Sequence, residues 1–250
     1  MYFEWLYIYG LIHCMIPGLP LYMGFVFIIT VAATAGFLIR AFNDSKFLSI
    51  LVLFWLLIQS VFAIRGFYLN AYTIPPRLIF AVAPPLVLVV LCLFLIQSNN
   101  NSRNVSAKVL TLMHVIRIPV EISLYLLFTK KLIPGVMTFE GRNFDIFSGI
   151  TAVFIWYFGY HKPILPRFVL VAWNLLCLGL VLNVVITGIM AAPTIFQKIA
   201  FDQPNSAILY FPFIWLPSFV VPAVIFAHLF CLRQLFIKKP LVHEDVQVPV

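Results

Sequence analysis

The sequence contains little charge. Of its 250 residues, 10% are Asp, Glu, Lys or Arg and 63% are hydrophobic. Soluble chains have about 25% charged and about 45–50% apolar residues, so this composition excludes a soluble fold. The polar connectors between the apolar runs are too short for a folded extramembrane domain. We therefore predict one transmembrane helical-bundle domain over residues 1–240, followed by a short cytoplasmic tail at 241–250.

Motifs for common membrane and nucleotide chemistry are also missing. There is no GxGxxG, GxxxxGK[ST], HExxH or aspartate-rich diphosphate motif, so nucleotide and metalloprotease activities have no support. The last predicted span has no lysine for a retinal Schiff base. The four cysteines show no CxxC spacing and imply neither a zinc knuckle nor a disulfide framework. We expect no metal and no cofactor, with one alternative left open: His114 and His228 have similar predicted depths and could ligate a haem.

Long uncharged apolar runs predict seven transmembrane helices. They cover about 18–40, 47–69, 78–97, 108–128, 145–160, 168–192 and 208–234. Residues 5–16 are apolar and aromatic but too few to cross a bilayer as a helix, and Pro17 follows them. This stretch predicts a short N-terminal interfacial helix. The predicted fold class is an all-α, polytopic integral membrane protein.

The Lys and Arg residues predict the orientation of the bundle. If the N-terminus faces outward, more of them lie inside than outside, and Arg233, Lys238 and Lys239 at the C-terminal end agree with this choice. We therefore predict an N-out/C-in, multi-pass protein of a bacterial inner membrane or another plasma membrane. The net charge of +8 does not indicate nucleic-acid binding, because the cations are scattered in ones and twos at helix ends.

The fourth predicted span carries the clearest functional signal. His114, Arg117 and Glu121 fall within a sector of about 60° on one helix face. Ionised residues near the bilayer centre cost at least about 2.5–3.5 kcal/mol each, so these side chains should face the bundle interior and pair. The i, i+4 spacing predicts an ion pair between Arg117 and Glu121, and Pro119 predicts a kink beside it. The stripe is either a structural lock or a site for a substrate, ion or proton.

The loop between the fourth and fifth predicted spans is unusually polar. Asn143 and Asp145 are suited to cap the start of the fifth helix, whereas capping leaves Glu140 and Arg142 unexplained. These two could line a polar mouth on the outer side. The further candidates for substrate or ion binding are Arg65, Glu140, Arg142, Asp145 and Asn183.

The buried charges predict transport or binding of a small solute, an ion or a proton. Two alternatives remain. One is an intramembrane enzyme acting on a lipid or isoprenoid, with Glu121 or His114 as general acid or base. The other is a non-catalytic membrane subunit or sensor. The expected partners are the lipid bilayer and a small-molecule or ion ligand, while a homo-oligomer or a membrane partner stays open.

Overall fold

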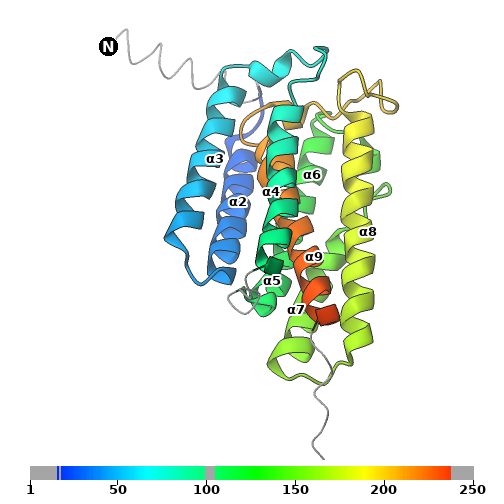
Figure 1. Cartoon of the computed structure of the whole chain (residues 1–250). Helices are drawn as coiled ribbons and strands as arrows, with labels where there is room; N and C mark the ends of the chain where they lie inside the picture. Colours follow the sequence, from blue (N-terminus) through cyan, green and yellow to red (C-terminus); the bar gives the residue numbers. More distant parts are fainter. Residues whose placement is uncertain (1–15, 17, 99–104, 238–250) are drawn as a thin grey trace, which may run out of the picture.

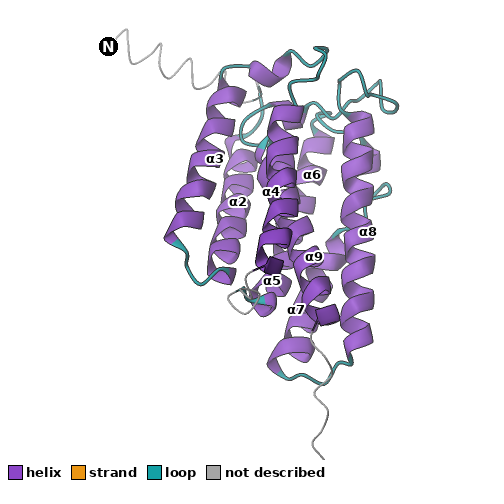
Figure 2. Cartoon of the chain, viewed as in Figure 1, coloured by secondary structure: helices purple, strands orange, loops and turns teal. Residues whose placement is uncertain are grey.

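The computed structural model describes residues 16, 18–98 and 105–237. Within these ranges every regular element is a helix, and the helices pack lengthwise into one bundle (Figures 1 and 2). The α-helices are α2 (Leu21–Ala41), α3 (Lys46–Ile64), α4 (Ile79–Ser98), α5 (Ala107–Met113), α6 (Arg117–Thr129), α7 (Ile146–Trp156), α8 (Arg167–Ala191) and α9 (Val221–Ile237). The interfacial helix predicted at residues 5–16 falls, apart from its last residue, outside the described part of the chain, as does the tail at 241–250.

Short turns of 3-10 or π helix complete the helical elements. They are η1 (Phe67–Leu69), η3 (His114–Ile116), η4 (Gly135–Met137), η5 (Tyr157–His161), η6 (Ala207–Leu209) and η7 (Leu216–Val220). Two of them extend an α-helix directly: η5 continues α7, and η7 leads into α9. A third, η3, joins α5 to α6.

Helices occupy all seven predicted apolar ranges, with shifts at their ends. Five segments are long and apolar enough to cross a membrane, namely Leu21–Ala41, Lys46–Ile64, Ala107–Thr129, Arg167–Ala191 and Leu216–Ile237. Helix α4 (Ile79–Ser98) is a further apolar helix of the bundle. The predicted start of the last span at residue 208 was wrong, because the chain makes a 3-10 turn there and becomes continuously helical at Leu216. This is the architecture of a multi-pass helical membrane protein.

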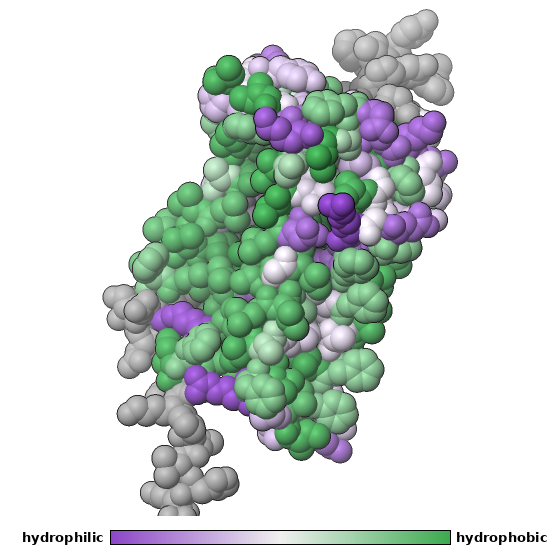
Figure 3. Space-filling view, turned by 90° about the vertical axis from the view of Figure 1, so that its right-hand side faces the viewer, coloured by the Kyte–Doolittle hydropathy of each residue, from purple (hydrophilic) through white to green (hydrophobic). Residues whose placement is uncertain are grey.

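The outer surface of the bundle is apolar. Phe54, Phe94 and Leu176, on three different helices, are 59%, 66% and 71% exposed. Figure 3 shows the face that includes α8: hydrophobic residues cover most of its middle, and hydrophilic residues gather towards its two ends. A helix that is apolar on both its inner and outer faces suits a lipid environment.

Helix α9 lies at the centre of the bundle. It packs against α8, α5 and α4 (Figure 1). Its side chains are accordingly buried on most sides, and Phe230, His228 and Ala227 have no exposed surface at all. A polar side chain on this helix therefore lies in the protein interior.

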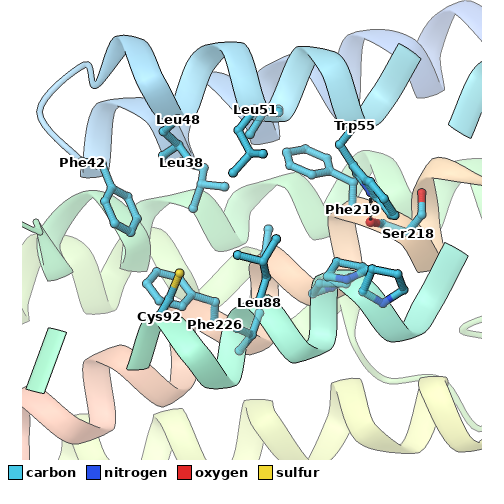
Figure 4. A pocket seen from close by; sticks show the side chains of 16 residues that line it. Leu38, Phe42, Leu48, Leu51, Trp55, Leu88, Cys92, Ser218, Phe219 and Phe226 are labelled. Atoms are coloured by element: carbon cyan, nitrogen blue, oxygen red, sulfur yellow. Dashed lines mark hydrogen bonds between the residues drawn. The ribbon is translucent and has the colours of Figure 1, made fainter. Parts of the chain in front are cut away.

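An apolar groove separates α3 from α4. It has a volume of about 160 Å³, and residues of α2 and α9 complete its walls. Figure 4 shows Leu51 and Trp55 of α3 on one side of this α3–α4 groove, and Leu88 and Cys92 of α4 on the other. The lining is aliphatic and aromatic apart from Ser218 and Cys92.

Two indole groups attach α3 to η7 beside this groove. Trp55 Nε1 donates a hydrogen bond to the Ser218 carbonyl over 2.9 Å, and Trp215 Nε1 donates to the Leu56 carbonyl over 3.1 Å. Pro222 lies four residues after Ser218 and has no N–H to offer that carbonyl. The Trp55 indole supplies a donor that the proline cannot.

Replacing Trp55 with Phe should lower the free energy of unfolding by about 1 kcal/mol, because the buried Ser218 carbonyl loses this donor. Thermal unfolding of the purified protein in detergent measures the change. Phe54→Leu, on the lipid side of the same helix, is the control and should leave the transition near its original temperature. A Trp55→Phe variant as stable as the wild type would show that the indole bond contributes nothing.

Candidate functional site

The charged stripe lies where the fourth helical segment departs from regular α-helix. Helix α5 ends at Met113, the 3-10 turn η3 follows, and α6 begins at Arg117, two residues before Pro119. A 3-10 turn in the middle of a long helical segment is a common mark of strain or of a hinge. His114, Arg117 and Glu121 are 0%, 2% and 1% exposed. All three side chains face the bundle interior, as the helix-face pattern predicts.

The ionic partner of Arg117 is Asp145. Arg117 Nη1 lies 2.9 Å from Asp145 Oδ1 and also donates to the Cys177 carbonyl over 3.4 Å. The predicted ion pair between Arg117 and Glu121 is therefore wrong. Helical spacing brings residues i and i+4 close, but the guanidinium turns across the bundle towards the loop that precedes α7.

Asp145 was expected to cap α7, and the structure gives it a different task. It occupies the N-cap position, yet its side chain makes no capping hydrogen bond to the backbone. One carboxylate oxygen instead meets Arg117 and accepts a longer hydrogen bond from Ser148 Oγ at 3.4 Å. The Asp145 carboxylate therefore pairs with the Arg117 guanidinium and does not cap the start of α7.

Glu121 is held by a neutral amide. Asn143 Nδ2 lies 2.7 and 2.8 Å from the two carboxylate oxygens of Glu121 and 2.9 Å from the Met137 carbonyl oxygen. Asn143 Oδ1 in turn accepts the backbone N–H of Asp145 at 3.0 Å. The loop between α6 and α7 thus delivers two side chains, one to each charged residue of α6.

This loop needs glycine at position 141 to fold against η4. A Cβ at Gly141 would lie 2.4 Å from the Gly135 carbonyl oxygen and 2.7 Å from Val136 Cα. Both neighbours are backbone atoms and cannot move aside independently. The tight packing of Gly141 on η4 holds the loop in place. Asn143 therefore reaches Glu121, and Asp145 reaches Arg117.

Two histidines stack beside this charged group. The rings of His114 and His228 are 3.9 Å apart between centroids and inclined by 15°. His228 Nδ1 lies 3.0 Å from Asn174 Oδ1, and Trp173 packs its ring against both histidines. Two axial haem ligands point nitrogen atoms at one iron from opposite sides, whereas these rings lie face to face. The arrangement does not fit the haem alternative.

Polar groups continue from the histidines towards the α5 end of the bundle. Thr111 Oγ1 lies 3.8 Å from Cys231 Sγ, and the Tyr160 hydroxyl interacts with both side chains. Beyond them Gln234 Nε2 donates to the Val105 carbonyl over 3.3 Å. Together with Glu121, Asn143, the Arg117–Asp145 pair and the two histidines, these residues form a polar string along the bundle axis.

The remaining predicted site residues lie away from the string. The side chains of Glu140, Arg142 and Asn183 are exposed, although Asn183 Nδ2 donates to the Arg142 carbonyl over 3.0 Å. Arg65 is also exposed, at the end of α3. Of the five further candidates, the structure brings Asp145 to the charged stripe.

A small cavity adjoins the charges. Its volume is about 30 Å³, and its walls include Arg117, Glu121 and Asp145. A water molecule needs at least about 10–15 Å³ on this scale, so the cavity has room for roughly two waters. It is too small for an organic solute in the arrangement described.

Several buried nitrogens of the polar string have no hydrogen-bond partner among the described residues. They are Nε and Nη2 of Arg117, both ring nitrogens of His114, and Nε2 of His228. Buried polar atoms are normally paired, so each unpaired one calls for an explanation, such as a bound water or a functional role. The string therefore combines fixed pairs with ring nitrogens that have no described partner.

Comparison of the chain with protein-family models, with curated proteins and with solved structures finds no match.

Asn143, Asn174 and His228 complete the site, although the sequence indicated Asn143 only as a helix cap and His228 only as a possible haem ligand. Each is buried, and Asn174 and His228 interrupt otherwise apolar helices. The sequence signal for Asn174 and His228 was a lone polar residue inside an apolar span. A polar side chain at that depth usually pairs with a residue on another helix. Asn143 resembled a helix cap and gave no sign of its contact with Glu121.

A double-mutant cycle should assign the partner of Arg117. Arg117→Gln or Asp145→Asn alone leaves a buried charge uncompensated and should lower the free energy of unfolding by about 3–5 kcal/mol, whereas the double variant should regain most of this loss. Thermal or denaturant unfolding in detergent measures each step. The matched cycle of Arg117→Gln with Glu121→Gln should show weaker coupling. Stronger coupling to Glu121 would contradict the described pairing.

A side chain at Gly149 should force α7 away from the charged stripe. A Cβ there would lie 2.8 Å from Ile118 Cγ1, 3.1 Å from Ile118 N and 3.3 Å from Arg117 Cβ. We expect Gly149→Ala to cost about 1–3 kcal/mol of unfolding free energy through overpacking. Gly179→Ala in α8 is the control, since no heavy atom of the described residues lies within 4 Å of its added Cβ and alanine favours helix. Equal stability of the two variants would argue against a tight α6–α7 crossing.

Proposed function

We propose that this protein crosses the membrane seven times, N-out and C-in, and transfers protons through the interior of its bundle. In this proposal α4 and the α7–η5 segment supply two spans besides the five long ones. The distribution of Lys and Arg supports the orientation. The predicted transport of a small solute, ion or proton is thereby narrowed to protons.

The stacked histidines carry this proposal. Along the α5–η3–α6 segment, His114 follows Thr111 and precedes Arg117 and Glu121. Its ring stacks on His228, and three of the four ring nitrogens have no partner within the described ranges. Linked carboxylates and histidines inside a membrane are typical of proton relays.

The size of the site favours protons over larger cargo. The cavity beside Arg117 and Glu121 measures about 30 Å³. It accommodates water molecules, which can carry a proton between side chains that do not touch. A solute with several heavy atoms would have to separate helices that are packed tightly around α9.

The two carboxylates have different roles in this proposal. Asp145 pairs with Arg117 and keeps the buried guanidinium neutralised. Glu121 receives hydrogen bonds from the neutral Asn143 amide, so it can gain a proton without leaving a cation unpaired. Glu121 is therefore the proposed proton acceptor, and the histidines pass the proton on towards Thr111 and Tyr160.

Proton flux into liposomes tests the proposal. The reconstituted wild type, driven by a potassium diffusion potential with valinomycin, should acidify a trapped pH-sensitive dye faster than empty liposomes. Glu121→Gln preserves the shape of the side chain and one of its two hydrogen bonds from Asn143 but cannot take up a proton. We expect it to reduce the flux at least about tenfold.

Asp44→Asn is the matched control for this measurement. Asp44 pairs with Arg40 on the surface, where both side chains are more than half exposed. Its replacement should leave the flux unchanged. No flux in the wild type, or full flux in Glu121→Gln, would reject proton transfer and leave the lipid-acting enzyme or the membrane subunit as the better hypothesis.

A further inference from the structure

A second groove runs along the apolar surface between α4 and α8. This α4–α8 groove has a volume of about 80 Å³, and residues of η7 and α9 form its floor. Leu86, Val185 and Ile225 are typical of its aliphatic lining, and Ile189, which is 46% exposed, stands at its rim. In a bilayer the mouth of such a groove faces hydrocarbon chains.

One residue of the groove lining has a buried acceptor without a donor. Asn205 lines the groove and is 1% exposed. Its backbone N–H donates to the Ala191 carbonyl over 2.8 Å, and its Nδ2 donates to the Gly188 carbonyl over 3.3 Å. Asn205 Oδ1 has no partner in the described part of the chain. A ligand that donates a hydrogen bond would satisfy it.

Glycine at position 188 leaves room for the Met137 side chain beside this amide. A Cβ there would lie 3.2 Å from Met137 Cε and 3.7 Å from Asn205 Nδ2. Asn205, Gly188 and Met137 therefore meet at one point of the groove lining. The arrangement is that of a specific pocket, mostly apolar with one placed polar group.

The groove also borders the charged site. Val184, Leu216 and Val221 line both the α4–α8 groove and the cavity beside Arg117 and Glu121. Met137 lines the groove with its side chain while its carbonyl holds Asn143. An occupant of the groove would contact the wall of the polar string without entering it.

We propose that the α4–α8 groove binds a single-chain amphiphile with a hydroxyl headgroup, such as a long-chain alcohol or a monoacylglycerol. The hydroxyl donates to Asn205 Oδ1, and the chain lies against Val185 and extends towards Ile225. A carboxylate headgroup would not fit, because it has no hydrogen to donate and would meet the unpaired oxygen. This binding does not depend on proton transfer and is measured separately from it.

Photolabelling of the full-length protein in nanodiscs tests the site. The probes are hexadecanol with a diazirine in its chain and the methyl ether of the same molecule, which cannot donate a hydrogen bond. We expect the alcohol to label α8 and α9 peptides of the groove about fivefold more than the ether, as one hydrogen bond predicts. The α3–α4 groove (Figure 4) should take both probes equally.

Three variants sharpen the test. Asn205→Leu removes the acceptor at similar volume and should abolish the preference for the alcohol. Ile189→Trp places a bulky group at the rim and should reduce labelling of the groove, whereas Ile186→Trp on the same exposed side of α8 should not. Equal labelling by alcohol and ether in the wild type would overturn the proposal, as would equal labelling of the two tryptophan variants. These two comparisons decide the matter even if Asn205→Leu fails to fold.

Discussion

A buried arginine that requires a counter-ion organises the interior of this bundle. Arg117 is among the largest side chains with almost no exposure, and an unpaired charge at that depth is strongly destabilising. Its partner Asp145 precedes α7, so α6 and α7 must cross closely, and Gly149 at the crossing permits this. The same loop brings Asn143 to Glu121. One electrostatic requirement therefore positions a helix crossing, a loop and the second carboxylate.

Much of the fold could be predicted from the sequence because lipid imposes a simple rule on composition. Apolar runs long enough to cross a bilayer must be helical, and the observed helices follow the predicted ranges closely for α2, α4 and α8. The wrong span boundary lies where no charged residue marks the end of the apolar run. Apolar residues 208–215 extend the hydrophobic run beyond the helix, although they form turns that cover its end. Hydropathy cannot distinguish such buried turns from a span.

The sequence predicted which residues of one helical segment share a face. It did not predict which residues of other segments they contact. Helical geometry places His114, Arg117 and Glu121 on one face, and their burial follows from the cost of charge in lipid. Which residues they meet depends on how helices cross, which a single sequence does not encode in a readable pattern. Asp145 and Asn143 therefore resembled ordinary helix caps. His228 was matched with His114 by predicted depth alone, and their stacking follows from the packing of α5 against α9.

The central claim is that Glu121 exchanges protons while the Arg117–Asp145 pair holds the surrounding structure. Infrared difference spectra of the reconstituted protein between acidic and alkaline pH, recorded in H₂O and in D₂O, test this claim most directly. The account predicts that one component of the protonated-carboxyl absorption shifts in D₂O, is lost in Glu121→Gln and persists in Asp44→Asn. If Glu121→Gln left the protonated-carboxyl absorption unchanged from that of the wild type, the account would be contradicted.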